Sequence, residues 1–154
     1  MALVYLGLGS NLGDKNNNIL LAIDNIISKI GAIVAQSSFI TTSAWGFNSE
    51  NDFLNAVVLI QTDVQPFELL EFTQEIEKNL GRKNKTDNAY TDRLIDIDIL
   101  FYDDLILNHP KLTIPHPLIH KRLFVLEPLA EITPNFIHPQ LQLTVDELKR
   151  LLSK

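Results

Sequence analysis

The chain has 154 residues, of which 45% are hydrophobic and 21% charged, and it contains no cysteine. This length favours one domain over residues 1–154. The absence of cysteine excludes disulfides and thiolate zinc sites, which fits a cytoplasmic protein. We also expect a monomer. A net charge of −6 argues against a nucleic-acid-binding protein, and no apolar run or leader segment suggests contact with a membrane.

Hydrophobic spacing predicts alternating strands and helices in the first hundred residues. Gly31 and Gly81 follow the two segments with helical periodicity and should end them, and Pro66 should begin the second. The expected elements are a strand over residues 3–8, a helix over 19–30, strands over 33–41 and 53–61, a helix over 66–80, and a strand over 93–101.

This β-α-β-β-α-β order predicts an α+β fold with a ferredoxin-like antiparallel sheet. Both helices should pack on one face of the sheet, which leaves the opposite face open for ligands. A C-terminal extension follows Phe101, and it should end in a helix over residues 144–152, because Thr144 and Glu147 have capping-box spacing.

Two carboxylates on the last strand of this unit are the main chemical signal. Asp96 and Asp98 lie two residues apart, so they should share one face of the strand while Ile95, Ile97 and Ile99 face the helices. Paired carboxylates repel each other unless a cation lies between them, and Mg²⁺ is commonly held by one or two carboxylates and phosphate oxygens. An exposed strand face with solvated carboxylates remains the alternative.

Further residues would extend this site. Arg93 provides a guanidinium fork for phosphate oxygens, and Phe53 and Asn55 should share one face of their own strand. If that face is the open one, an aromatic ring and an amide lie near the carboxylates, because neighbouring strands are about 4.8 Å apart. The long polar connections over residues 42–52 and 82–92 are typical of lids or binding loops.

Taken together, these motifs resemble one enzyme family. Gly9-Ser10-Asn11, Phe53-Leu54-Asn55, Arg93-x-x-Asp96-x-Asp98, Pro115-His116-Pro117 and Arg122-x-Phe124, in this order, are similar to 6-hydroxymethyl-7,8-dihydropterin pyrophosphokinase of folate biosynthesis. The resemblance implies transfer of diphosphate from ATP to the pterin hydroxymethyl group, with release of AMP. It also implies two Mg²⁺ ions on Asp96 and Asp98, and small-molecule substrates as the only partners.

The resemblance further implies three groups of site residues. The catalytic group is Arg82, Arg93, Asp96 and Asp98. The pterin-binding group is Thr42, Ser43, Ala44, Trp45, Phe53, Asn55 and Phe124. The ATP-binding group is Gln74, Glu77, Arg82, Tyr90, Arg93, Lys111, Thr113, His116 and Arg122. Taken alone, each Phe is more often a core residue, and Gln74 and Glu77 equally fit a solvated helix face.

The chain departs from the family pattern before Arg93, where Tyr90-Thr91-Asp92 replaces a segment close to Trp-Gly-Pro. Asp92 places an anion beside the arginine expected to bind phosphate. Two other classes of protein remain open on the residues alone. A ligand-binding module of the same fold would leave the paired carboxylates without a role, and a metal-dependent nuclease or nucleotidyltransferase would favour a more basic surface.

Overall fold

The computed structural model describes residues 1–42, 52–81 and 94–153. Within these ranges the chain forms a five-stranded antiparallel sheet, a separate two-stranded hairpin and four α-helices. The strands are β1 (Ala2–Ser10), β2 (Ala32–Gln36), β3 (Ile40–Thr42), β4 (Phe53–Thr62), β5 (Asp96–Tyr102), β6 (Leu107–His109) and β7 (Leu112–Ile114). The helices are α1 (Lys15–Lys29), α2 (Pro66–Asn79), the short 3-10 helix η1 (Ile119–Lys121), α3 (Leu123–Ile132) and α4 (Val145–Leu152).

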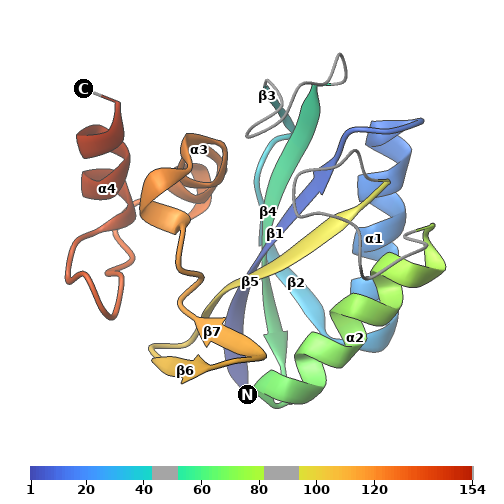
Figure 1. Ribbon diagram of the computed structural model, residues 1–154, viewed down its shortest axis with the longest axis horizontal. Coiled ribbons are helices and arrows are strands. Elements are labelled where there is room, and N and C mark those ends of the chain that lie inside the picture. Colours follow the sequence, from blue (N-terminus) through green and yellow to red (C-terminus); the bar gives the residue numbers. More distant parts are fainter. Residues whose placement is uncertain (43–51, 82–93, 154) are drawn as a thin grey trace.

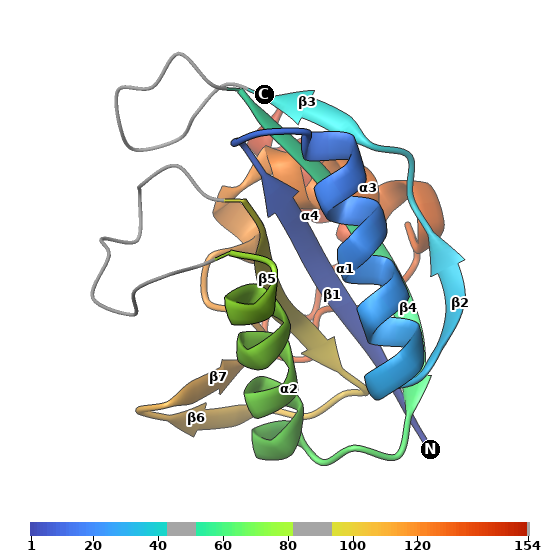
Figure 2. The same ribbon diagram turned by 90° about the vertical axis from the view of Figure 1, so that its right-hand side faces the viewer.

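The strands of the main sheet lie in the order β2-β4-β1-β5, and β3 pairs with the start of β4. Helices α1 and α2 cover one face of this sheet, and α3 and α4 lie on the other side (Figures 1 and 2). The expected antiparallel sheet is therefore present, with the first two helices on one face. No helix in the described ranges is long and apolar enough to cross a membrane.

The first two helices begin and end where local chemistry favours it. The Asp14 side chain caps α1 by accepting a hydrogen bond from the Asn17 N–H, at 3.1 Å. Pro66 opens α2, and Gly81 follows its end with φ of +125°, a conformation that favours glycine. A Cβ at Gly81 would also collide with Leu94, whose side chain lies over it.

The core between the sheet and the first two helices follows strand alternation. Val4, Leu6 and Leu8 of β1 point to this side, and so do Ile95, Ile97 and Ile99 from β5 and the segment before it. All six side chains are buried against apolar residues of α1 and α2. Asp96 and Asp98 therefore lie on the opposite face of β5.

The second core lies on that opposite face and depends on a β-bulge that alternation did not predict. Leu6 pairs with Ile99 but Tyr5 pairs with Phe101, so Leu100 is an extra residue in β5. As a result, Leu100 and Phe101 both join the cluster with Tyr5 and Val57. The apolar faces of α3 and α4 complete this cluster.

Three elements differ from the sequence-based expectation. The single strand expected over residues 33–41 is divided into β2 and β3, because Ser37 bonds to both backbone groups of Val57 and Ser38 turns to another partner. The hairpin β6–β7 and helix α3 were not expected, and α3 contains Pro128, which is unusual inside a helix. The C-terminal helix is present, with both hydrogen bonds of its capping box.

Candidate functional site

The two carboxylates of β5 lie opposite glycines of the neighbouring strand β1. Asp96 pairs with Gly9 of β1 and Asp98 pairs with Gly7. On the other side of β1, Gly9 pairs with Asn55 of β4. Residues paired across antiparallel strands point to the same face, so Gly9 leaves a trough with a backbone floor between Asp96 and Asn55, whereas the Leu100 side chain lies over Gly7.

The far wall of this trough is formed by Phe53 and Asn55. A Cβ placed on Gly9 would lie 3.1 Å from Asn55 Oδ1 and 3.7 Å from Phe53 Cδ1. The buried Asn55 amide donates from Nδ2 to Thr42 Oγ1 at 2.9 Å, which fixes its orientation. Its Oδ1 is therefore turned toward the trough. Phe53 and Asn55 thus lie on the same face of the sheet as Asp96 and Asp98, as expected.

Glu77 is buried rather than solvated on the surface of α2. Its side-chain Oε2 accepts a hydrogen bond from the Ile97 N–H at 2.7 Å. Ile97 lies between Asp96 and Asp98, and β5 is an edge strand, so this bond fastens α2 to the strand that carries the carboxylates. Gln74, one turn earlier on α2, is exposed.

His116 faces both a carboxylate and a guanidinium. Burial and, to a smaller extent, the Arg122 guanidinium lower the pKa of His116 to about 4, although the nearby Asp96 carboxylate acts in the opposite direction. Its ring Nδ1 accepts a hydrogen bond from the Leu118 N–H at 3.2 Å, and the backbone N–H of His116 donates to the Leu100 carbonyl at 3.0 Å. The imidazole is therefore neutral near pH 7, with its proton on Nε2.

A cleft of about 250 Å³ lies between α2, β5 and the β6–β7 hairpin. Its polar lining comes from Asp98, Lys111, Thr113 and His116. Apolar side chains line the remainder, from Leu70 of α2 to Ile97, Ile99 and Leu112. The cleft thus joins one carboxylate of the trough to three residues expected to contact ATP.

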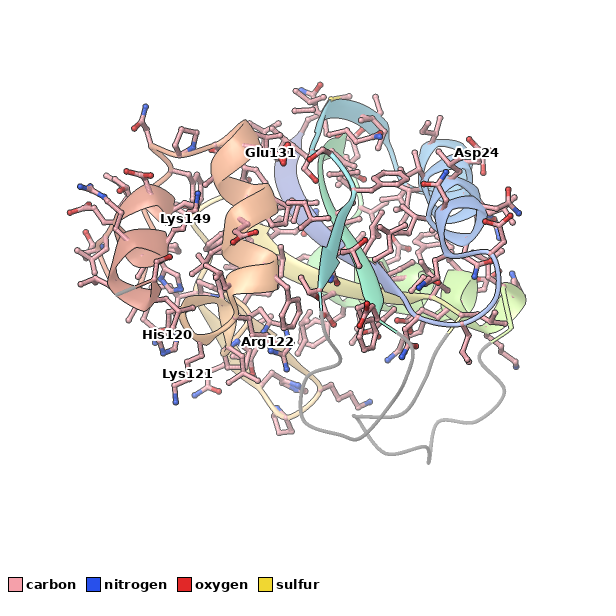
Figure 3. All side chains as sticks on the ribbon, turned by 90° about the horizontal axis from the view of Figure 1, so that it is seen from above. Asp24, His120, Lys121, Arg122, Glu131 and Lys149 are labelled. Carbon is pink, nitrogen blue, oxygen red and sulfur yellow. The ribbon has the colours of Figure 1, made fainter. Side chains whose placement is uncertain are left out.

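The start of α3 adds a basic and an aromatic side chain to the same region. Arg122 is the N-cap residue of α3, and its Cζ lies 5.5 Å from the centre of the Phe124 ring. At this distance the guanidinium makes a cation–π contact with the ring. Figure 3 shows His120, Lys121 and Arg122 together at this end of the helix.

Six expected site residues lie outside the described part of the chain. They are Ser43, Ala44, Trp45, Arg82, Tyr90 and Arg93. Within residues 1–42, 52–81 and 94–153, no group of three or more His, Asp or Glu side chains could hold a metal ion. Within these ranges, Asp96 and Asp98 would therefore hold a metal only together with ligands from elsewhere, such as a substrate or water.

Two features of the site were not recognised from the sequence, although the sequence contains a signal for each. Gly7 and Gly9 are spaced as two residues on one strand face, which predicts a floor without side chains. His116-Pro117 belongs to a recurring turn, because His109 and His138 also precede a proline. In all three turns His Nδ1 accepts from the backbone N–H two residues later, at 3.1 to 3.2 Å.

Comparison with known proteins places the chain among pterin-processing enzymes. Residues 5–134 match the family described as 7,8-dihydro-6-hydroxymethylpterin-pyrophosphokinase. A 2-amino-4-hydroxy-6-hydroxymethyldihydropteridine pyrophosphokinase of Porphyromonas gingivalis is 42% identical over 142 residues, which cover 91% of this chain and 96% of that protein. The enzyme of the same name from Aquifex aeolicus is also 42% identical, over 97% of this chain and 91% of its own.

Solved structures show the same fold at low sequence identity. The crystal structure of Plasmodium falciparum HPPK-DHPS with pteroate superposes with a TM-score of 0.78 at 18% identity. The match covers 97% of this chain but only 42% of the Plasmodium chain. This chain therefore corresponds to one part of that longer protein.

Proposed function

We propose a role for each residue of the described site, starting from the family of the chain. The chain belongs to the 7,8-dihydro-6-hydroxymethylpterin-pyrophosphokinase family. The chain is an ATP-dependent pyrophosphokinase of folate biosynthesis. It transfers the pyrophosphoryl group of ATP to the hydroxymethyl group of the dihydropterin, so that AMP is released. What remains to be assigned is the part that each residue has in this reaction.

The trough over Gly9 is the proposed pterin site. A flat heterocycle fits against a backbone floor, and Asn55 offers a fixed acceptor for its polar edge. Phe53 and Phe124 supply aromatic faces, and such ring contacts are worth roughly 0.5–1.5 kcal/mol beyond burial. Thr42 fixes Asn55, and Ser43, Ala44 and Trp45, which lie outside the described residues, are further proposed pterin contacts.

Asp96 and Asp98 are the proposed Mg²⁺ ligands, with two ions as the working number. Two carboxylates on one face fit a hard cation whose other ligands are phosphate oxygens and water. Bound Mg²⁺ would neutralise phosphate charge and lower the pKa of the attacking hydroxyl group. Glu77 holds the strand between the two carboxylates, so their spacing is set before substrates bind.

The cleft beside Asp98 is the proposed ATP site. Its apolar part suits a nucleotide base, while Lys111 and Thr113 reach its polar groups. His116 is neutral and carries its proton on Nε2, so it donates a hydrogen bond to a phosphate oxygen without adding charge. Arg122 supplies the positive charge, together with Arg82 and Arg93 in the proposal, and Gln74 and Tyr90 complete the nucleotide contacts.

We also propose that residues 1–154 form one ferredoxin-like domain that acts as a monomer. The strand order β2-β4-β1-β5, with α1 and α2 on one face, supports this assignment. Catalysis in this arrangement depends on positioning and electrostatics, because no described residue is an obvious general base.

The observation that carries this proposal is the row Asn55, Gly9 and Asp96 across three neighbouring strands. It places the trough over Gly9 within about two strand spacings, or about 10 Å, of the carboxylates. The test is to incubate the protein with ATP, Mg²⁺ and the hydroxymethyl dihydropterin and to follow AMP. AMP that forms only with both substrates supports the proposal, whereas ADP as product would contradict pyrophosphoryl transfer.

A further inference from the structure

A contact between α3 and the segment that joins β2 to β3 lies away from the residues assigned above. The carboxylate of Glu131 accepts two hydrogen bonds from Ser38, one from its N–H at 2.9 Å and one from its hydroxyl at 2.6 Å. The Ser38 hydroxyl and then the Ser38 N–H lower the pKa of the Glu131 carboxyl. The contact is therefore made by an ionised group at neutral pH.

In the proposed pterin site, α3 with Phe124 forms one wall, and β3 and β4 with Thr42 and Asn55 form the other. Glu131 lies on the first of these sides and Ser38 on the second, each away from the proposed site residues. Phe124 and Glu131 are seven residues apart on α3, so they lie on one side of the helix, about 10 Å along its axis. Thr42 is four residues beyond Ser38, about 13 Å away in an extended chain. Figure 3 shows Glu131 beside the β2–β3 segment, and Arg122 at the opposite end of α3.

The neighbouring residue connects the same segment to the sheet. The Ser37 N–H donates to the Val57 carbonyl at 2.9 Å, and Ser37 Oγ accepts from the Val57 N–H at 2.9 Å. Adjacent serines therefore fasten the segment in two directions, Ser37 to β4 and Ser38 to α3. Beyond them, β3 pairs with β4, and Thr42 Oγ1 holds Asn55.

A second contact secures the end of α3 independently. The Tyr5 hydroxyl donates to Thr133 Oγ1 at 2.9 Å, just after the last residue of the helix. Apolar residues of α3 also pack in the second core. Loss of the Glu131 contact should therefore leave α3 folded and docked, while its lateral position relative to β3 becomes less restricted.

We propose that Glu131 is a positioning residue for the pterin site, which sets the distance between the wall carrying Phe124 and the wall carrying Thr42 and Asn55. It acts through Ser38 and touches neither substrate. The proposal rests on the pterin assignment made above. Its effect should be selective, because the ATP cleft is lined by α2, β5 and the β6–β7 hairpin, whereas the two hydrogen bonds of Glu131 go to Ser38.

The test compares Glu131→Ala, Glu131→Gln and Ser38→Ala by equilibrium binding of the pterin and by steady-state kinetics. We expect Glu131→Ala to weaken pterin binding and raise the pterin KM on the order of three- to tenfold, since displacements of about 1 Å strongly affect positioning. The ATP KM should change less than twofold. Ser38→Ala keeps the backbone donor and should have a smaller effect, and adding it to Glu131→Ala should change little more.

Glu147 provides a matched control. Its carboxylate also accepts a backbone N–H, that of Thr144 at 3.0 Å, but it caps α4 and contacts neither wall. Glu147→Ala should lower stability by an amount similar to Glu131→Ala and should leave the pterin affinity unchanged. Comparing Glu131→Ala with Glu147→Ala therefore separates a general loss of stability in α3 and α4 from a change in the position of the pterin site.

Four outcomes would overturn the proposal. Pterin affinity within twofold of the wild type in Glu131→Ala would reduce the contact to a structural role. An equal rise in the pterin and ATP KM values, or an equal loss in Glu147→Ala, would remove its selectivity. Wild-type protein that neither binds the pterin nor forms AMP would remove the proposed function, and the positioning role with it, whereas unchanged binding in the variants contradicts the positioning role alone.

Discussion

Along the sheet face that carries Asp96 and Asp98, the half near Ser10 and the half near Ala2 are built from different residues. The first half presents glycine backbone, an amide and two carboxylates. The second presents Tyr5, Val57, Leu100 and Phe101, and α3 and α4 cover it. The same strands thus provide a ligand surface at one end and a core at the other.

The bulge at Leu100 marks the boundary between these halves. It brings two consecutive apolar side chains of β5 to one face, which enlarges the apolar area on which α3 and α4 dock. The side chains of Asp98 and Asp96, two and four residues before Leu100, stay outside that core. Because stability and chemistry are placed in separate halves, substitutions should affect one without the other.

The largest expected effect is in the ligand half. Asp98→Ala should lower turnover by at least about 10³-fold, because it removes a carboxylate proposed to bind Mg²⁺. Pterin binding and the free energy of unfolding should be preserved, since the side chain lies outside both cores. Steady-state kinetics, pterin binding and urea denaturation check this, with the exposed Asp104→Ala as a control. Full activity of Asp98→Ala would contradict the metal assignment.

The matching change in the covered half is Phe101→Ala. Phe101 is fully buried and contacts the rings of Tyr5, Phe136 and His138, with centroid distances of 5.9, 4.7 and 5.5 Å. Its removal should lower the free energy of unfolding by about 3–5 kcal/mol. The pterin and ATP KM values of the folded fraction should stay near those of the wild type. Large changes in both KM values would show that the two halves are coupled.

His116 lies close to the boundary and makes stability depend on pH. Its pKa of about 4 in the folded protein is below the ordinary value of 6.5, so between these values the unfolded chain binds more protons. The contribution of His116 to the free energy of unfolding is therefore present above pH 6.5 and is lost as the pH decreases toward 4. From pH 7 to 5 the wild type should lose about 2 kcal/mol more than His116→Asn, as measured by urea denaturation. Equal losses would contradict a neutral, buried imidazole.

The smallest effect concerns the glycine floor. A Cβ at Gly9 would lie 3.1 Å from Asn55 Oδ1, whereas one at Gly7 would make ordinary contacts of 3.5 Å with Leu100. Gly9→Ala should therefore raise the pterin KM about tenfold, equivalent to about 1.4 kcal/mol, by filling the trough. Gly7→Ala is the matched control and should change it less than twofold. Equal effects of the two substitutions would place the pterin elsewhere on the face.

Much of the fold could be predicted because its periodicity is simple. Alternation correctly placed Ile95, Ile97 and Ile99 toward the helices, and the capping box at Thr144 identified the last helix. The bulge could not be predicted, because residues 99–101 are all apolar and alternation contains no information within such a run. Helix α3 was missed because Pro128 argues against a helix interior.

Parts of the site could not be predicted from the sequence, because some side chains lie in surroundings that are unusual for their residue type. Glu77 reads as a solvated helix residue, because carboxylates are rarely buried without a partner. The partner is the Ile97 N–H, and the pairing of an edge strand with a helix is a property of the assembled fold. The contact between Glu131 and Ser38 joins residues 93 positions apart and has no local sequence signal.

The contact of Leu94 with Gly81 has a consequence for how this protein can diverge. Because these residues meet, the two described ends of the connection over 82–93 lie close together. The entropy cost of closing a chain segment grows only logarithmically, by about 0.6 kcal/mol for each doubling of its length. A change in the length of this connection should therefore cost little folding free energy, and the limit on its divergence would come from Arg82, Tyr90 and Arg93, which the proposed function assigns to the ATP site.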